Sequence, residues 1–168
     1  MVDWTETLES AFRAAEAAGF PPFLEGPHRS TAFNASPYSV TLAALAAGQA
    51  LAGRRVWIDR LIAVLDRLPQ SGAEAQFVLL GGSLLDAGAD PKDLDCVIFY
   101  RSATSAPLGD LAALQARACA EGVDARLMPS DGDPLVFARA LLFYGMLYSA
   151  SRDLRLRRGV VLVDCRAP

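Results

Sequence analysis

Histidine is nearly absent from this sequence of 168 residues, and cysteine is scarce. The single histidine, His28, lies in a stretch rich in proline, glycine, serine and asparagine, so a metal site made of several histidines is excluded. The three cysteines, Cys96, Cys119 and Cys165, lack the paired spacing of a zinc site. This usage is typical of a reducing, intracellular compartment. Cys96 and Cys165 fall in apolar runs, where we expect small buried thiols.

Long apolar runs are also missing, since none approaches the length of a membrane span. The first residues include Asp3, Glu6 and Glu9 and lack the basic start and apolar centre of a signal peptide. A formal net charge of −3 gives no overall attraction to nucleic acid and leaves room only for a local basic patch. With 52% hydrophobic and 21% charged residues, the composition is that of a globular chain. We therefore expect a cytoplasmic protein without membrane association.

The chain has the length of one domain that can bury a core, and we expect residues 1–168 to form it. Residues 1–70 are predicted to be its helical N-terminal part, with a long irregular connection at residues 20–38. Apolar residues at helical spacing predict three helices there, at Trp4–Ala18, Ser39–Ala52 and Arg54–Leu68. For the third helix the predicted buried stripe is Val56, Trp57, Leu61, Ile62, Val64, Leu65 and Leu68.

Residues 71–168 are predicted to contain the sheet, because strand and helix patterns alternate there. The expected strands are Phe77–Leu80, Leu94–Tyr100, Val123–Met128 and Gly159–Cys165, and the expected helices are Leu108–Glu121 and Leu135–Ser149. The fold class is therefore α/β (α+β), with a small mixed sheet, helices on one side of it, and the N-terminal helices packed on the same core. The last strand is expected to join the sheet or its edge.

The helix at residues 135–149 is apolar nearly all round. Such a helix is either buried on more than one side or forms a contact surface. We expect it to be an interface, either with a second copy of the chain or with another protein.

The central stretch FVLLGGSLLDAGADPKDLDCVIFY, residues 77–100, carries the most specific pattern. A buried strand leads into a Gly81-Gly82-Ser83 turn, where glycines let the backbone turn sharply and approach a ligand closely. Ser83 is expected near the start of a short helical turn, where free N–H groups favour an anion. Asp93 and Asp95 are two positions apart on the next strand and therefore project together. Two carboxylates beside an anion site suit a divalent cation that bridges to a phosphate.

This pattern resembles the signature of the DNA polymerase beta-like nucleotidyltransferase superfamily. That signature is a glycine-serine turn after a strand, followed about ten residues later by Asp-x-Asp at the start of the next strand. In that superfamily a third carboxylate comes from a later strand, and Asp124, near the start of the strand at residues 123–128, stands at the corresponding place. The order of motifs in the N-terminal half, Pro-Pro-Phe, Ser-Pro-Tyr and an arginine-rich helix, is similar to an uncharacterised bacterial family of nucleotidyltransferase-like proteins.

The resemblance implies transfer of a nucleotidyl group from a nucleoside triphosphate to an acceptor hydroxyl, with Mg²⁺ or Mn²⁺ as cofactor. By the same resemblance, Asp93, Asp95 and Asp124 are the catalytic and metal-binding residues, and Gly81, Gly82 and Ser83 hold the triphosphate. The acceptor stays open among a protein, an RNA and a small molecule. Asp131 and Asp133 are instead predicted to be turn and helix N-cap residues.

The chain departs from the superfamily pattern directly after Ser83. Many active members carry a basic residue there, whereas this chain has Leu84, Leu85 and Asp86. An acid close to a triphosphate is unfavourable unless a cation intervenes, and Lys92 is one candidate for that cation. The alternative hypothesis is therefore a catalytically inactive binding module, or an antitoxin-like interaction module, that retains the fold.

Overall fold

The computed structural model of the chain describes residues 4–25, 31–103, 109–150 and 158–166. His28, Arg155 and Arg157 lie outside these ranges. In chain order the elements are α1 (Trp4–Ala17), β1 (Tyr38–Thr41), α2 (Leu42–Ala46), η1 (Ala52–Arg54), α3 (Arg55–Leu65), η2 (Leu68–Ser71), β2 (Ala73–Leu80), η3 (Gly82–Leu85), β3 (Leu94–Ser102), α4 (Leu111–Ala120), β4 (Val123–Pro129), α5 (Pro134–Ser149) and β5 (Val161–Asp164). Within the described ranges no helix is both long and apolar enough to cross a membrane.

The strands of the described residues form one mixed five-stranded sheet in the order β1-β5-β2-β3-β4. β2 pairs antiparallel with both β3 and β5, whereas β1–β5 and β3–β4 are parallel pairs. This confirms the mixed α/β fold and the strands expected after residue 76. The last strand is interior to the sheet, because β5 hydrogen-bonds to β1 on one side and to β2 on the other.

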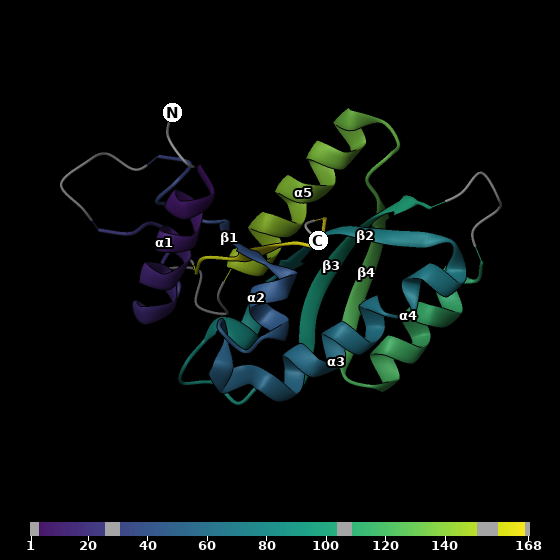
Figure 1. Cartoon of the computed structure of the whole chain (residues 1–168), viewed down its shortest axis with the longest axis horizontal. Coiled ribbons are helices and arrows are strands. Elements are labelled where there is room, and N and C mark those ends of the chain that lie inside the picture. The colour runs from purple at the N-terminus through teal and green to yellow at the C-terminus, as the bar shows by residue number, and fades with distance from the viewer. Residues whose placement is uncertain (1–3, 26–30, 104–108, 151–157, 167–168) are drawn as a thin grey trace.

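Helices cover both faces of the sheet, so the expectation of helices on one side is wrong. One buried cluster joins α1, α2, α3 and α4 to residues such as Cys96 and Ile98 of β3. A second cluster joins α5 to Val97 and Phe99, which alternate with them on the same strand. Because β3 is apolar on both faces, each face needs a cover, and Figure 1 shows α5 on the other side of the strands from α3 and α4.

The predicted helix at Ser39–Ala52 is wrong at both of its ends. Residues 38–41 form β1, paired with β5, and α2 covers only residues 42–46. Thr41 ends the strand and caps the helix, since its hydroxyl accepts a hydrogen bond from the Ala44 N–H at 3.2 Å. The Tyr38 hydroxyl donates to the Pro21 carbonyl at 2.7 Å and so holds the strand against the preceding irregular segment. The alanine-rich run begins only at residue 43, whereas Val40 and Thr41 are β-branched and suit the pairing with β5.

The predicted buried stripe of α3 is right in its centre and wrong at its start. Leu61 and Val64 are completely buried, but Val56 is 61% exposed. Ile58, which the prediction omitted, is buried in its place. The helix begins at Arg55, and its rotation about its axis is set by the sheet beneath it. The apolar pattern alone placed the stripe slightly out of phase.

Helix α1 stands beside β1 (Figure 1) and contributes to the main core. Phe12 lies against Phe20, with ring centroids 5.7 Å apart, and Phe20 lies against Tyr38 at 6.3 Å. Phe12, Ala15 and Phe20 are buried in the same cluster as the residues of α3 and β3. The N-terminal helix thus shares the apolar core formed by the sheet.

Helix α5 has one packed face and one exposed face, so burial on more than one side is wrong for it. The packed face contains Phe137, Ala140, Leu141, Tyr144 and Tyr148. Phe137 meets Phe99 of β3 edge to face, with centroids 5.2 Å apart. The opposite face carries large apolar side chains that are more than half exposed.

Candidate functional site: paired carboxylates beside a glycine turn

The predicted glycine-serine turn lies at the end of β2. Gly81 continues the extended backbone, Gly82 has φ +66°, and η3 forms the short helical turn at residues 82–85. The turn is anchored because Leu84 and Leu85 are buried in the main core. Those two positions therefore have no room for the basic residue that many superfamily members carry.

Asp95 and Asp124 lie side by side across the parallel pair β3–β4, where they are direct register partners. Adjacent strands are about 4.8 Å apart. By strand alternation both side chains lie on the α5 face of the sheet, with Val97 and Met128 of the second cluster. The topology thus brings together two of the three predicted acids, which are 29 positions apart in the sequence.

Gly82 closes one side of this carboxylate pair. A Cβ at residue 82 would overlap Oδ2 of Asp95, and the left-handed φ also favours glycine. The Gly81 N–H donates to the Asp95 carbonyl oxygen at 3.4 Å, which ties the turn to β3. The turn is therefore built directly against the Asp95 carboxylate, and Gly82 is the residue that makes this approach sterically feasible.

The Asp95 carboxyl is half-buried, and its pKa is raised above the usual value for aspartate. Burial is the largest cause, followed by the negative charges of Asp93 and Asp124, while Arg126 opposes the shift. Arg126 lies on the same face as Asp124, with Nη2 3.4 Å from its Oδ1. Arg126 is half exposed, so the pairing leaves most of the site's negative charge uncompensated.

Asp93 is exposed and lies just before β3, close enough to affect the pKa of Asp95. Asp93 and Asp124 both line a hollow of about 510 Å³ beside the start of β4. The other lining residues are Ala112, Gln115, Ala116 and Cys119 of α4, and Arg126 of β4. Its volume falls in the range of small-molecule sites, about 300–1,000 Å³. The small alanine side chains leave space next to the acids.

The donor set fits a divalent cation such as Mg²⁺, which takes carboxylate oxygens and keeps water or phosphate as further ligands. Asp95 and Asp124 supply two carboxylates in register, and a cation would offset the burial and the neighbouring negative charges that raise the pKa of Asp95. As the side chains stand, no group of three or more metal-ligating side chains converges anywhere in the described part of the chain. Asp93 would have to turn toward the other two acids to join them.

Tyr148 is a residue of this site that the sequence did not indicate. It comes from the last turn of α5 and lies on the turn, where a Cβ at Gly81 would overlap the Tyr148 Cβ. The pKa of its hydroxyl is raised, first by burial and then by surrounding negative groups that include Asp95 and Asp124. Tyr148 therefore covers the glycine turn and faces the two acids. Nothing in the local sequence places residue 148 beside residue 81.

Asp86, the acid that departs from the superfamily pattern, is compensated by a cation. Arg158 places Nη2 2.7 Å from Oδ2 of Asp86. Arg54 braces the same loop by donating to the carbonyl oxygens of Asp86 and Ala89, the latter at 2.9 Å. Lys92, the candidate from the sequence, is exposed and forms no ion pair among the described residues. Arg158 is thus the basic group nearest to the unfavourable acid.

The predicted roles of Asp131 and Asp133 are confirmed as structural. The Asp131 carboxylate accepts from the Ser102 N–H at 2.7 Å, and Asp133 caps α5 by accepting from the Leu135 N–H at 2.7 Å. Cys96 is fully buried as expected, and burial raises the pKa of its thiol. Cys165 is partly buried, and burial raises its pKa to about 12.

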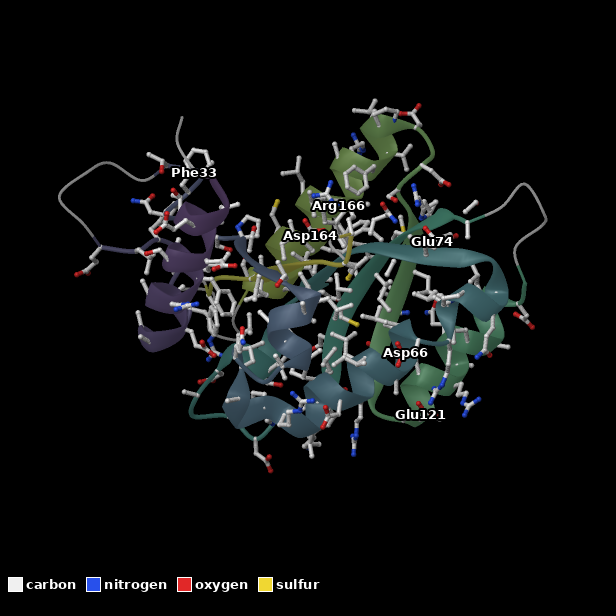
Figure 2. All side chains as sticks on the ribbon, in the orientation of Figure 1. Phe33, Asp66, Glu74, Glu121, Asp164 and Arg166 are labelled. Carbon is white, nitrogen blue, oxygen red and sulfur yellow. The ribbon has the colours of Figure 1, made fainter. Side chains whose placement is uncertain are left out.

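A second hollow, of about 500 Å³, lies at the opposite end of the sheet, where β2 begins and β3 ends. Both arginines that line it are already paired, since Arg101 binds Glu74 at 2.8 Å and Arg166 binds Asp164 at 2.8 Å. Figure 2 shows Glu74, Asp164 and Arg166 at this end. The Arg166 guanidinium also stacks over the Phe77 ring at 4.4 Å. Because neither arginine at this end is left unpaired for a ligand, the carboxylate pair remains the stronger candidate.

Residues 23–164 match the model of a family described as "Family of unknown function (DUF6932)". No curated protein and no solved structure matches the chain at a significant level.

Proposed function

The chain belongs to this family of unknown function (DUF6932), and we propose that it is a divalent-metal-dependent nucleotidyltransferase of the DNA polymerase beta-like superfamily. Its substrates are a nucleoside triphosphate and an acceptor hydroxyl. The observation that carries the proposal is the register pairing of Asp95 with Asp124 directly against the Gly82 turn. Carboxylates at the ends of neighbouring strands, beside a turn that begins with two glycines, suit a metal–triphosphate complex.

Asp95 and Asp124 hold the cation in this proposal, and Asp93 joins them from its exposed position before β3. When bound, the cation supplies charge neutralisation at the attacking and leaving oxygens. The Ser83 hydroxyl forms no hydrogen bond to another described residue and is available to donate to a phosphate oxygen. The hollow of about 510 Å³ beside Asp93 and Asp124 offers space for the rest of a substrate.

The group transfer balances with the residues of this site. The acceptor oxygen forms a bond to the α-phosphorus, the bond to the pyrophosphate oxygen breaks, and pyrophosphate leaves with the electron pair. Asp124 takes the proton of the acceptor hydroxyl. Arg126, which lies beside Asp124, is placed to interact with phosphate oxygens once the carboxylate engages a cation.

The test is a panel of nucleoside triphosphates with Mg²⁺, Mn²⁺ or a chelator, read by thermal unfolding and by intact mass. A triphosphate with metal at 100 times its Kd should raise Tm by about 5 °C or more, and the same triphosphate with chelator should not. A mass increase of one nucleotidyl group on an acceptor protein would identify the transfer. If no triphosphate changes Tm in the presence of either Mg²⁺ or Mn²⁺, the proposal fails.

The second candidate is an interaction module that keeps this fold without catalysis. The observation that favours it is the exposed apolar face of α5. Such a module needs no metal-dependent binding of a triphosphate, so the same panel separates the two candidates.

A further inference from the structure

Helix α5 is strongly apolar over its 16 residues, yet none of its residues is fully buried. Six large apolar side chains form what we call its outer face: Leu135 (68% exposed), Val136 (55%), Leu142 (68%), Phe143 (59%), Met146 (67%) and Leu147 (51%). Together they present about 700 Å² of apolar surface, above the largest patch on most monomers. An uncovered face of this size on one helix indicates a docking surface.

We propose that the outer face of α5 binds the outer face of α5 of a second copy of this chain, antiparallel and about a two-fold axis near Leu142. The proposal rests on none of the metal chemistry of the carboxylate site. It goes beyond the proposed function because it assigns an interaction surface and its occupant.

The area supports a second copy as the occupant. A standard interface buries about 800 Å² on each partner, and the outer face supplies nearly that amount from one helix about 24 Å long. A two-fold contact uses the same patch twice, so one face of this size is sufficient for both sides. The second cluster needs no further cover, because α5 already packs its other face on it through Phe137 and Tyr148.

The single charge on this face also fits an identical partner. Arg139 is exposed between Leu135 and Phe143 and forms no ion pair with another described residue. With the axis near Leu142, Arg139 of each copy faces Phe143 of the other, where a guanidinium stacks favourably on an aromatic ring. The same register sets Leu135 against Leu147. The two Arg139 side chains are then separated by the rings and do not confront each other.

The helix surface leaves room for close approach. A Cβ at Gly145 would have no atom within 4 Å, so the flank of the outer face beside Leu142 is open. Ala138, about two helical turns before Gly145 on that flank, is also small and exposed. Large side chains of one copy can therefore pack into the shallow groove of the other.

Sedimentation equilibrium over a concentration series tests the assignment. The wild-type chain should be a dimer, and Leu142→Glu should weaken self-association about 30-fold or more, because it places two carboxylates at the axis. The matched control is Val56→Glu, which adds the same charge at an equally exposed apolar residue of α3 and should leave the dimer intact. Circular dichroism of both variants checks that they fold alike.

Disulfide trapping tests the register without a disruptive substitution. In a Cys119→Ser background, which removes the exposed native thiol, Leu142→Cys should form a covalent dimer on mild oxidation. Leu135→Cys alone should not, but mixed with Leu147→Cys it should give the mixed dimer. A covalent dimer of Leu135→Cys with itself overturns the antiparallel register.

Two other results overturn the proposal as a whole. One is a wild-type chain that stays monomeric over the whole concentration series. This holds also if the monomeric chain sediments with phosphatidylglycerol vesicles, because the outer face would then bind a lipid surface and not a second copy. The other is a dimer that Leu142→Glu leaves unchanged.

Discussion

Arg158 and Asp86 form an ion pair, with 2.7 Å between Nη2 and Oδ2, that links the residue before Gly159 to the loop after the glycine turn. The pair compensates the acid that sets this chain apart from the superfamily pattern. Arg158 reaches this loop from a segment remote in sequence. The segment that precedes β5 thus supplies a basic group to the loop after the glycine turn.

Replacing Arg158 with methionine should therefore affect ligand binding more than stability. The pair is partly exposed, so its loss should cost about 0.5 kcal/mol of unfolding free energy. Asp86 would be left uncompensated, and metal-dependent triphosphate affinity should fall about tenfold, as for one lost charge-assisted contact. Calorimetric titration measures the affinity. Arg117→Met on α4 removes an equally paired, more exposed arginine and should leave the affinity unchanged.

Asp95→Asn should abolish metal-dependent triphosphate binding and leave the ligand-free chain as stable as before or more stable. The reason is that the substitution removes a half-buried charge lying among Asp93 and Asp124. We expect Tm without ligand to rise by about 2 °C. Thermal unfolding with and without Mg²⁺ and a triphosphate measures both effects. A fall of several degrees in the ligand-free Tm would instead show that Asp95 has a structural role.

The stability gain from Asp95→Asn should also depend on pH. The pKa of Asp95 is higher in the folded chain than in the unfolded one, so its charged form destabilises the fold. This destabilisation is complete above the folded pKa and vanishes below the unfolded pKa of about 4. The Tm difference between variant and wild type should therefore be largest near neutral pH and disappear in acid. A difference that grows toward low pH would contradict the assigned shift.

Gly82→Ala should destabilise the chain by about 1–3 kcal/mol, because it combines a left-handed φ with overlap at the Asp95 carboxylate. Two controls separate these causes. Gly19→Ala carries a similar φ of +74° in open space, and Gly53→Ala has open space without a left-handed φ. Chemical unfolding should rank the losses as Gly82, then Gly19, then Gly53. An equal loss of unfolding free energy in Gly82→Ala and Gly19→Ala would show that the steric overlap with Asp95 contributes nothing.

The rotation of α3 can be tested with two truncations. Ile58→Ala should cost about 2–4 kcal/mol because the side chain is buried in the main core. Val56→Ala should change the unfolding free energy by about 0.5 kcal/mol or less, since that side chain is mostly exposed. Denaturant unfolding of both variants measures the difference. Similar losses of unfolding free energy at the two positions would instead support the buried stripe predicted from the sequence, which included Val56.

The sequence by itself determined the elements whose patterns are local. Alternation over Val123–Met128, the apolar run after Asp95 and the glycine turn predicted β4, β3 and η3, because side-chain period and backbone freedom are properties of neighbouring residues. The same reasoning predicted that Asp93 and Asp95 belong to one site with the turn. The glycine turn, Asp93 and Asp95 lie within about twenty residues of one another in the sequence, and this short separation limits how far apart they can lie in the fold.

Only the tertiary structure decided the relationships that need distant partners. Residues 39–41 form a strand because β5, a segment remote in sequence, pairs with them. Tyr148 covers Gly81, and Arg158 meets Asp86, because α5 and β5 return to the turn across the sheet. The packing of α5 likewise decided which half of a uniformly apolar helix stays exposed. A periodic pattern shows that a helix or strand has an apolar face, but the topology of the fold decides which element that face packs against.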